Sequence, residues 1–471
     1  MRRNRGKEGA AYNTGCMSTA LPIGPAIPAP LLRPALPARA GERRDWSGLA
    51  GASQALALAE AARTARGPLL VVVADTPAAE RLAREIPFFA GADLPVLGFP
   101  DWETLPYDAF SPHQDLISER LAVLHRLPGL RAGVVIVPMA TLMQRLAPQA
   151  YLDAYSLRLA RGDRLDLAQM RERLIRAGYT AVNQVMEHGE FAVRGGLLDL
   201  FPMGSEWPFR VELFDDEVES IRRFDPDSQR SQDSLPGVDL LPGREFPVNP
   251  QAIERFYQRY MQVFEANPAR SALYRELQAG RPPAGIEFYL PLFFEATATL
   301  FDYLPAHATI AWQEGCLAAG DAFWGTVRER FEARSLVRDY PPLPPAELYL
   351  EPGAVFGAFK RFAQIALRET ADDHALPIGT PPALPVDSRA AQPLAALQDF
   401  VAGFKGRTLI AAESLGRRET LREMLQRQHI GVQVLDDWAQ FIASDAPLAI
   451  AVAPVDEGLL LPPTSSVSRP R

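Results

Sequence analysis

Carboxylate side chains are the residues of this sequence best placed to do chemistry. Asp101 and Glu103 lie two residues apart in the segment DWETLPYDAFSPHQD, and another acidic pair, Asp436-Asp437, lies in a turn. Two neighbouring carboxylates can act as a general acid and a general base. Such a pair also needs a nucleophile, a metal or a phosphate cradle, and the surrounding residues supply none of these. We therefore assign no catalytic residue and predict an aromatic-rich loop that packs on a sheet edge.

Nucleotide hydrolysis requires a different set of residues. A Walker A loop contains Gly-Lys-Ser/Thr, in which the lysine contacts the nucleotide phosphates. Lysine occurs in this chain only at Lys7, Lys360 and Lys405. The sequence therefore excludes a standard P-loop anywhere between residues 8 and 359.

Length and composition set outer limits on the function. The chain has 471 residues, of which 47% are hydrophobic and 23% charged, and its net charge is −8. This length is too great for one core and predicts roughly three or four domains. The acidic total argues against nucleic-acid binding by bulk electrostatics. No apolar run reaches the ~18 residues that are needed to span a bilayer.

Metal and disulfide chemistry is not indicated either. Cys16 and Cys316 are far apart, and the six histidines show no HxH or HExxH spacing. No cysteine-based zinc site or disulfide framework can be built from such a set. The sparse cysteines fit a reducing compartment. We therefore expect a cytoplasmic protein with no metal centre and no membrane partner.

The elements that would position functional side chains are clearest between residues 189 and 230. Apolar and polar residues alternate there through short runs separated by Gly, Pro and Asp turns, which predicts a strand meander. One run divides its side chains between two faces: Phe209, Val211 and Leu213 on one, and Arg210, Glu212 and Phe214 on the other. The first face needs a core behind it. The second carries residue types typical of a protein-binding surface, although composition alone also fits an ordinary solvated sheet face.

The amino-acid sequence of this segment resembles that of a known family. GEFAVRGGLLDLFP followed by FRVELFDDEVESIRRFDP resembles the UvrA-binding domain shared by the excision-repair protein UvrB and the bacterial transcription-repair coupling factors (the Mfd family). DWETLPYDAFSPHQDLISERL, GYTAVNQVMEHGEF and AGIEFYLPLFF are similar to Mfd and not to UvrB. The resemblance runs from about residue 46 to about residue 460.

The patterns and the resemblance together predict an α/β multidomain protein. A degenerate UvrB-like (helicase-like) domain with a parallel sheet would carry an inserted α+β UvrA-binding domain, and a small α/β domain would follow. The expected boundaries are a disordered tail at 1–45, the first part of the degenerate nucleotide fold at 46–142, the UvrA-binding domain at 143–230, the second part of the nucleotide fold at 231–349, a linker at 350–396, the small domain at 397–460 and a divergent tail at 461–471.

Local signals refine this outline. Thr76 is predicted to cap a helix that has Pro77 at its first position. Asp166 is predicted to cap another helix, which ends at Gly178. Residues 397–460 read as strand, helix, strand, helix, strand. Met17 is an alternative start to Met1.

The resemblance implies a recruiting surface. The residues that bind UvrA in the family would correspond to Arg194, Phe201, Arg210 and Glu212 of this chain. The arginines would pair with acidic groups on UvrA, and the aromatic ring would fill a pocket. The alternative for Arg194 and Arg210 is pairing within the chain, with Asp199 or Glu212.

The sequence departs from its relatives in other places. Some members carry an arginine after the Gly-Tyr pair, where this chain has Thr180. The turn that matches the UvrB P-loop, at Gly51 and Ser53, keeps one glycine and lacks both the lysine and the Ser/Thr that follows it. We expect a dead nucleotide fold that serves as a scaffold and binds no cofactor, with phosphate binding by the bare helix N-terminus as the alternative. The chain also passes from DWETLPYDAFSPHQD directly to LISERL, with no room for the long aromatic hairpin that clamps DNA in UvrB.

The resemblance implies a function in nucleotide excision repair. The chain would be an N-terminal fragment of a coupling factor that recruits UvrA to stalled RNA polymerase. After PVDEGLLLP the sequence differs from that of the family, so the polymerase-binding and ATP-dependent translocase modules would be absent. We therefore expect a monomeric adaptor that is not an enzyme. ATP and Mg would belong only to the missing motor, and RNA polymerase and DNA would be partners of the missing modules. The alternatives are the translocase or helicase activity of the full-length family, or a weakly DNA-binding UvrB-like protein that uses arginines at 161–176 and 222–230.

Overall fold

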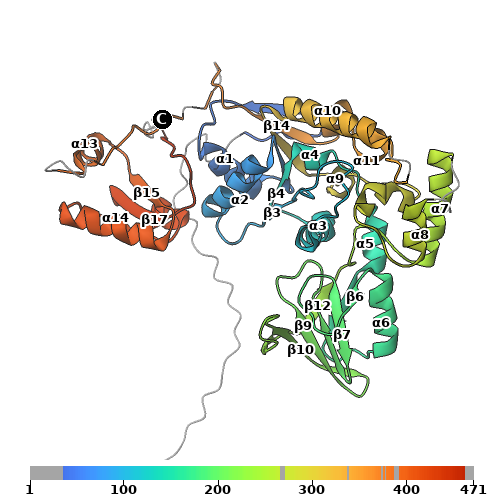
Figure 1. Cartoon of the computed structure of the whole chain (residues 1–471). Helices are drawn as coiled ribbons and strands as arrows, with labels where there is room; N and C mark the ends of the chain where they lie inside the picture. The colour runs from blue at the N-terminus through green and yellow to red at the C-terminus, as the bar shows by residue number, and fades with distance from the viewer. Residues whose placement is uncertain are drawn as a thin grey trace, which may run out of the picture.

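The computed structural model describes residues 35–265, 271–336, 339–372, 375–376, 378–386 and 392–461. Figure 1 shows a central α/β domain, with a second domain below it and a small domain to one side. Most of the predicted N-terminal tail, the alternative start at Met17 and nearly all of the divergent tail lie outside the described residues. No helix in the described part of the chain is long and apolar enough to cross a membrane.

The central domain is built on a six-stranded parallel sheet. Its order is β1-β14-β13-β2-β4-β3, with the strands at Arg43–Trp46, Ala363–Leu367, Thr309–Gln313, Leu69–Val73, Val134–Pro138 and Val96–Gly98. The strands β2 and β4 are buried along their whole length, as expected of a parallel sheet covered on both faces. The adjacent strands β14 and β13, from late in the chain, lie between β1 and β2, which come from its start, so the segment between β4 and β13 leaves this sheet and returns to it.

Helices cover both faces of the central sheet. Alternate residues of β2 enter two separate cores: Leu69 and Val71 pack with α1 (Ser53–Thr64) and α2 (Thr76–Ala90), whereas Leu70 and Val72 face the opposite core. That second core includes residues of α3 (Gln114–Arg126), α4 (Met139–Leu142) and α10 (Cys316–Arg334). The remaining helices of this domain are η1 (Leu127–Gly129), α5 (Gln149–Tyr155), α7 (Pro250–Phe264), α8 (Ala272–Gln278), η3 (Ile286–Phe293), α9 (Leu300–Tyr303), α11 (Pro345–Leu348) and α12 (Pro352–Phe359).

The structure moves two limits of the central domain. Strand β1 begins at Arg43, inside the predicted tail, because it pairs with β14 along residues 43–46. Strand β14 and helix α12 lie inside the predicted linker at 350–396. The segment AQIAL is short and adjoins a Pro-rich stretch, so only its partners β1 and β13 reveal it as a sheet strand. One capping residue also changes: Asp75, not Thr76, caps α2, accepting the Ala78 amide at 2.9 Å.

The inserted domain contains a second six-stranded sheet, of order β11-β10-β9-β8-β7-β6. Its pairs are antiparallel except β6 with β7. A two-stranded ribbon of β5 and β12 and the helix α6 (Leu167–Arg176) complete it. The strands are β5 (Leu157–Ala160), β6 (Thr180–Ala181), β7 (Glu190–Arg194), β8 (Leu197–Leu200), β9 (Phe209–Phe214), β10 (Glu217–Phe224), β11 (Ser231–Ser234) and β12 (Gly237–Leu240).

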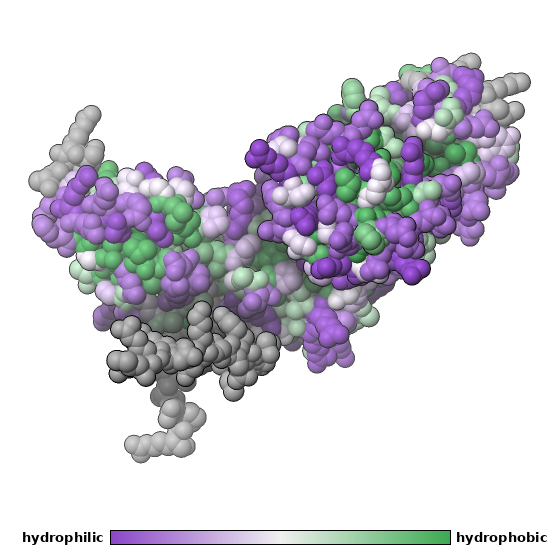
Figure 2. Space-filling model, turned by 90° about the horizontal axis from the view of Figure 1, so that it is seen from below, coloured by the Kyte–Doolittle hydropathy of each residue, from purple (hydrophilic) through white to green (hydrophobic). Residues whose placement is uncertain are grey.

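Helix α6 (Leu167–Arg176) has the predicted ends. Asp166 caps it by accepting the Ala168 and Gln169 amides, and Gly178 follows it with φ +92°. Met170 and Leu174 are buried in one core with apolar residues of the sheet. Viewed from below, where this domain points toward the reader, its surface is mostly hydrophilic with small apolar patches (Figure 2).

The small domain confirms the predicted strand and helix order. Its parallel strands lie in the order β15-β17-β16, at Thr408–Ala412, Leu448–Val452 and Gln433–Val434. The helices α13 (Ala395–Gly403), α14 (Leu415–Arg427) and α15 (Trp438–Ala443) complete it. Its side chains join the core formed by α1 and α2, so this domain is packed on the central one.

Candidate protein-binding face

The polar face of the inserted sheet brings the predicted site residues into neighbouring rows. The strand register aligns Ala192, Asp199 and Arg210 across β7, β8 and β9. The next row contains Arg194 and Glu212. On the other face Phe191, Leu198 and Val211 are buried, as the alternation predicted.

A buried carboxylate holds the two arginines of this face. Asp199 has a side chain only 1% exposed, and it accepts hydrogen bonds from Arg210 Nε at 2.7 Å and Arg210 Nη2 at 2.9 Å. Arg194 donates from Nη2 to the same carboxylate. The Arg210 guanidinium also lies over the Phe224 ring, 5.1 Å from its centroid. The hydrogen bonds to Asp199 raise the pKa of Arg210. The intramolecular pairing considered as an alternative is thus present, with Asp199 as the acceptor.

The two arginines differ in what they can offer to a partner. The Arg194 side chain is 51% exposed, whereas that of Arg210 is 16% exposed. Glu212 is half-buried and accepts a hydrogen bond from Ser220 Oγ at 2.7 Å. Of the two predicted arginines, Arg194 therefore has the greater free donor capacity.

Phe201 does not lie on the accessible surface. Its ring is buried and packs against that of His188, with centroids 4.0 Å apart. It belongs to a small cluster with Val185, Ala192 and Phe224. The expectation that this ring fills a pocket on a partner is therefore wrong for this conformation: it supports the face from within. The resemblance alone suggested Phe201 as a contact residue, and the local sequence did not reveal that other side chains cover it.

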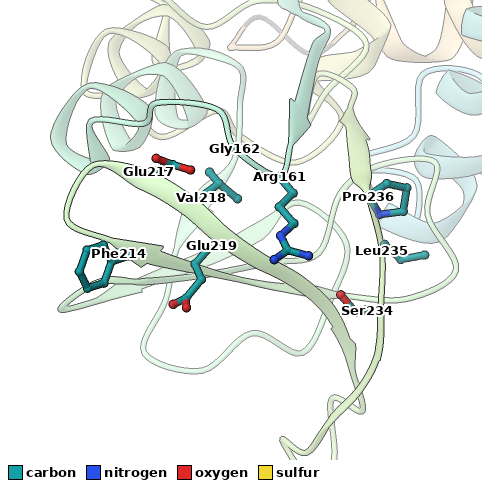
Figure 3. Close-up of a pocket in the computed structure, with 9 residues that line it drawn as sticks. All are labelled: Arg161, Gly162, Phe214, Glu217, Val218, Glu219, Ser234, Leu235 and Pro236. Atoms are coloured by element: carbon teal, nitrogen blue, oxygen red, sulfur yellow. The ribbon is translucent and has the colours of Figure 1, made fainter.

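Phe214 is the aromatic residue that this face exposes. Its side chain is 75% exposed at the end of β9, on the same side of the strand as Arg210 and Glu212. The alternation had already placed it there. It borders an open hollow of about 760 Å³ that is lined by Arg161, Gly162, Phe214, Glu217, Val218, Glu219, Ser234, Leu235 and Pro236 (Figure 3).

Contacts with α3 fix this domain on the central one. The His188 ring bridges Asp115 Oδ1 and the Ser205 carbonyl oxygen, each at 2.7 Å. Ser118 Oγ accepts the Gly204 amide at 2.8 Å. Thr180 is exposed on the edge strand β6, where its amide donates to the Gly189 carbonyl.

The turn at Gly51 and Ser53 is covered by the chain itself. Gly51 has φ +57°, and a Cβ atom there would lie 2.9 Å from the Gly458 carbonyl oxygen. The Ala52 amide donates to the Glu457 carbonyl at 3.2 Å, and Ser53 Oγ donates to the Ala50 carbonyl at 2.6 Å. Backbone from beyond β17 therefore occupies the start of α1, where a P-loop fold would present its amides to phosphate.

The acidic loop has structural contacts. Asp101 Oδ1 accepts hydrogen bonds from the Trp102 amide and from Gln144 Nε2 at 2.8 Å. The Trp102 and Tyr107 rings are buried beside Phe288. This confirms a packed aromatic loop. Among the described residues, no group of three or more His, Cys, Asp or Glu side chains could hold a metal ion.

Comparison with known proteins adds the family. Residues 157–246 match a family model described as the UvrB interaction domain, and residues 400–466 match one described as the MFD D3 domain. The transcription-repair-coupling factor of Escherichia coli (strain K12) is 42% identical over 404 residues, which cover 84% of this chain and 35% of that protein. The chain belongs to the transcription-repair coupling factor family.

Other members agree with this assignment. The Haemophilus influenzae factor is 37% identical over 435 residues, covering 91% of this chain and 38% of its own length. The Myxococcus xanthus factor is 35% identical over 329 residues, covering 66% and 27%. The matches thus span between 27% and 38% of the length of these coupling factors.

The match to the UvrB interaction domain corrects the predicted limits of 143–230. Residues 157–246 extend from the start of β5 to just beyond β12, so the paired ribbon opens and closes the domain. Before it, Leu146 forms a bridge with Ala298 of the central domain. Local sequence patterns could not predict this ribbon, because its two short strands lie far apart in the chain.

Proposed function

We propose that this chain recruits UvrA in transcription-coupled nucleotide excision repair, at sites of stalled RNA polymerase. Membership of the coupling-factor family and the presence of a UvrB interaction domain support this proposal. The observation that carries it is the polar face of the inserted sheet, where the half-exposed Arg194 lies on the same side as the exposed Phe214.

The chemistry of the face fits a protein partner. An arginine with free N–H groups forms charge-assisted hydrogen bonds to a carboxylate, and an exposed aromatic ring is a typical hot-spot anchor. Glu212 would meet a basic group and fix the register of docking. Arg210 would contribute mainly by supporting the surface, since its guanidinium is already held by Asp199.

We further propose that the central domain acts as a scaffold and hydrolyses no ATP. This is supported by the absence of lysine between residues 8 and 359 and by the filled turn at Gly51. ATP and Mg would serve the translocase activity of the full-length family, and RNA polymerase and DNA would be partners of its other modules. A turnover assay on this chain, with and without DNA, tests the scaffold proposal, which measurable ATP hydrolysis would overturn.

Binding to purified UvrA tests the recruiting proposal. We expect the whole chain to bind UvrA, and the double charge reversal Arg194→Glu/Arg210→Glu to weaken binding by at least about tenfold. The matched control is Arg171→Glu/Arg173→Glu, which makes the same charge change on exposed residues of α6, behind the sheet. Equal losses in both variants, or unchanged binding by a folded Arg194→Glu/Arg210→Glu variant, would exclude this face.

A further inference from the structure

Asp199 stands out among the acidic residues of the inserted domain. It is 1% exposed, it lies on the central row of the polar face, and its two oxygens receive every hydrogen bond that Arg194 and Arg210 donate to a carboxylate. Asp199 is too deeply buried to contact a partner directly, whereas Glu212 is half-buried.

The geometry gives the two arginines different orientations. Arg210 uses both Nε and Nη2 on Asp199, a two-point contact that fixes the plane of the guanidinium over Phe224. Arg194 donates to Asp199 from Nη2 alone, and its guanidinium carries further N–H donors. One buried carboxylate therefore holds one arginine completely and the other by a single nitrogen.

Two guanidinium groups share the Asp199 carboxylate, and Glu212 lies in the same row as Arg194. Arg194 is the more exposed of the two arginines, with a side chain that is 51% exposed. A partner carboxylate that approaches Arg194 meets a donor whose direction is already set, so less side-chain entropy is lost on binding.

We propose that Asp199 is a positioning residue for UvrA recruitment, which aims Arg194 at an acidic group of the partner by anchoring both guanidinium groups. This inference rests on the proposed function. It differs from a purely electrostatic account, in which any additional positive charge on the face would strengthen binding to an acidic partner.

Asp199→Asn separates the two accounts, because it keeps the shape of the side chain and makes the face more positive by one charge. Orientation by Asp199 predicts UvrA binding that is roughly tenfold weaker, despite the added positive charge. A purely electrostatic effect predicts stronger binding. The matched control is Asp239→Asn on β12, which makes the same charge change at an exposed site and should leave binding unchanged.

A double-mutant cycle shows whether Asp199 acts through the arginines. In an Arg194→Ala/Arg210→Ala background, Asp199→Asn should cause no further loss of UvrA affinity, because nothing remains to be positioned. An additional loss of the same size would mean that Asp199 acts by general destabilisation, and it would overturn the proposal.

Control measurements distinguish a loss of folding from a loss of UvrA binding. Circular dichroism and thermal unfolding establish that each variant is folded. If Asp199→Asn does not fold, Asp199→Glu keeps the charge but displaces the carboxylate, and wild-type affinity in that variant would overturn the proposal. If wild-type protein does not bind UvrA, the recruiting function itself fails. If Arg194→Glu/Arg210→Glu weakens binding but folded Asp199→Asn does not, the function stands and the positioning role falls.

Discussion

The Trp438 ring of α15 meets the Phe89 ring of α2 edge to face, with centroids 5.0 Å apart and planes at 81°. This contact joins the small domain to the central domain. Phe88 lies beside it at 6.1 Å, and Phe441 continues the cluster on the small-domain side. Aromatic pairs of this geometry contribute more than their buried area alone.

We expect Trp438→Ala to loosen the small domain. Removal of a buried tryptophan costs about 3 kcal/mol in the free energy of unfolding, through lost burial and the cavity that remains. Urea unfolding measures the loss, and hydrogen exchange should rise at the C-terminal end of α2. Leu415→Ala on α14 is the control, because that leucine is 64% exposed and its truncation should change little. Equal effects of the two substitutions would contradict this packing.

Gly51→Ala should destabilise the turn at the start of α1 for two reasons. The backbone φ of +57° costs a residue with a Cβ atom about 1–2 kcal/mol, and that atom would also press on the Gly458 carbonyl. Gly280→Ala isolates the first reason, because Gly280 has φ +73° with open space around its Cβ position. We expect the larger loss in unfolding free energy at Gly51, with faster hydrogen exchange at Ala52. Equal losses would mean that residues 457–458 do not press on the turn.

The predictions from sequence succeeded where a pattern is local. Alternation divided the side chains of β9 correctly, and the Asp166 cap and the buried strand β2 follow from neighbouring residues alone. The predictions failed where a segment far away in the chain determines the structure. Strand β14 needs β1 and β13 beside it, and the burial of Phe201 depends on His188 and Phe224. The resemblance predicted Arg194 and Arg210 as site residues, but only the folded sheet shows that Asp199 binds both.

Two aromatic substitutions should separate support from contact on the polar face. Phe201→Ala removes a buried ring and should lower the unfolding free energy by about 3 kcal/mol. Phe214→Ala removes an exposed ring, so stability should change by less than about 0.5 kcal/mol while UvrA affinity falls about tenfold. Thermal unfolding and UvrA binding are measured on both variants. Loss of stability without loss of binding in Phe214→Ala would reverse the assignment.

Glu287 should make the stability of the central domain depend on pH. Burial raises the pKa of this carboxyl above its ordinary value of 4.5, although the hydrogen bond from Ser111 Oγ at 2.7 Å partly opposes the shift. The folded state then binds the proton more tightly than the unfolded state. Protonation of Glu287 therefore contributes to the free energy of unfolding, and this contribution is fully present below the unfolded pKa. It is lost as the pH rises through the higher folded pKa.

Glu287→Gln removes this titration and keeps an oxygen that can accept the Ser111 hydroxyl. The variant should therefore gain stability relative to the wild type as the pH is raised from about 5 to about 8, when unfolding free energies are compared by urea titration. Glu295→Gln is the control, since its side chain is 88% exposed. A wild-type protein that became more stable than Glu287→Gln over this range would show that the buried carboxyl is held in its charged form.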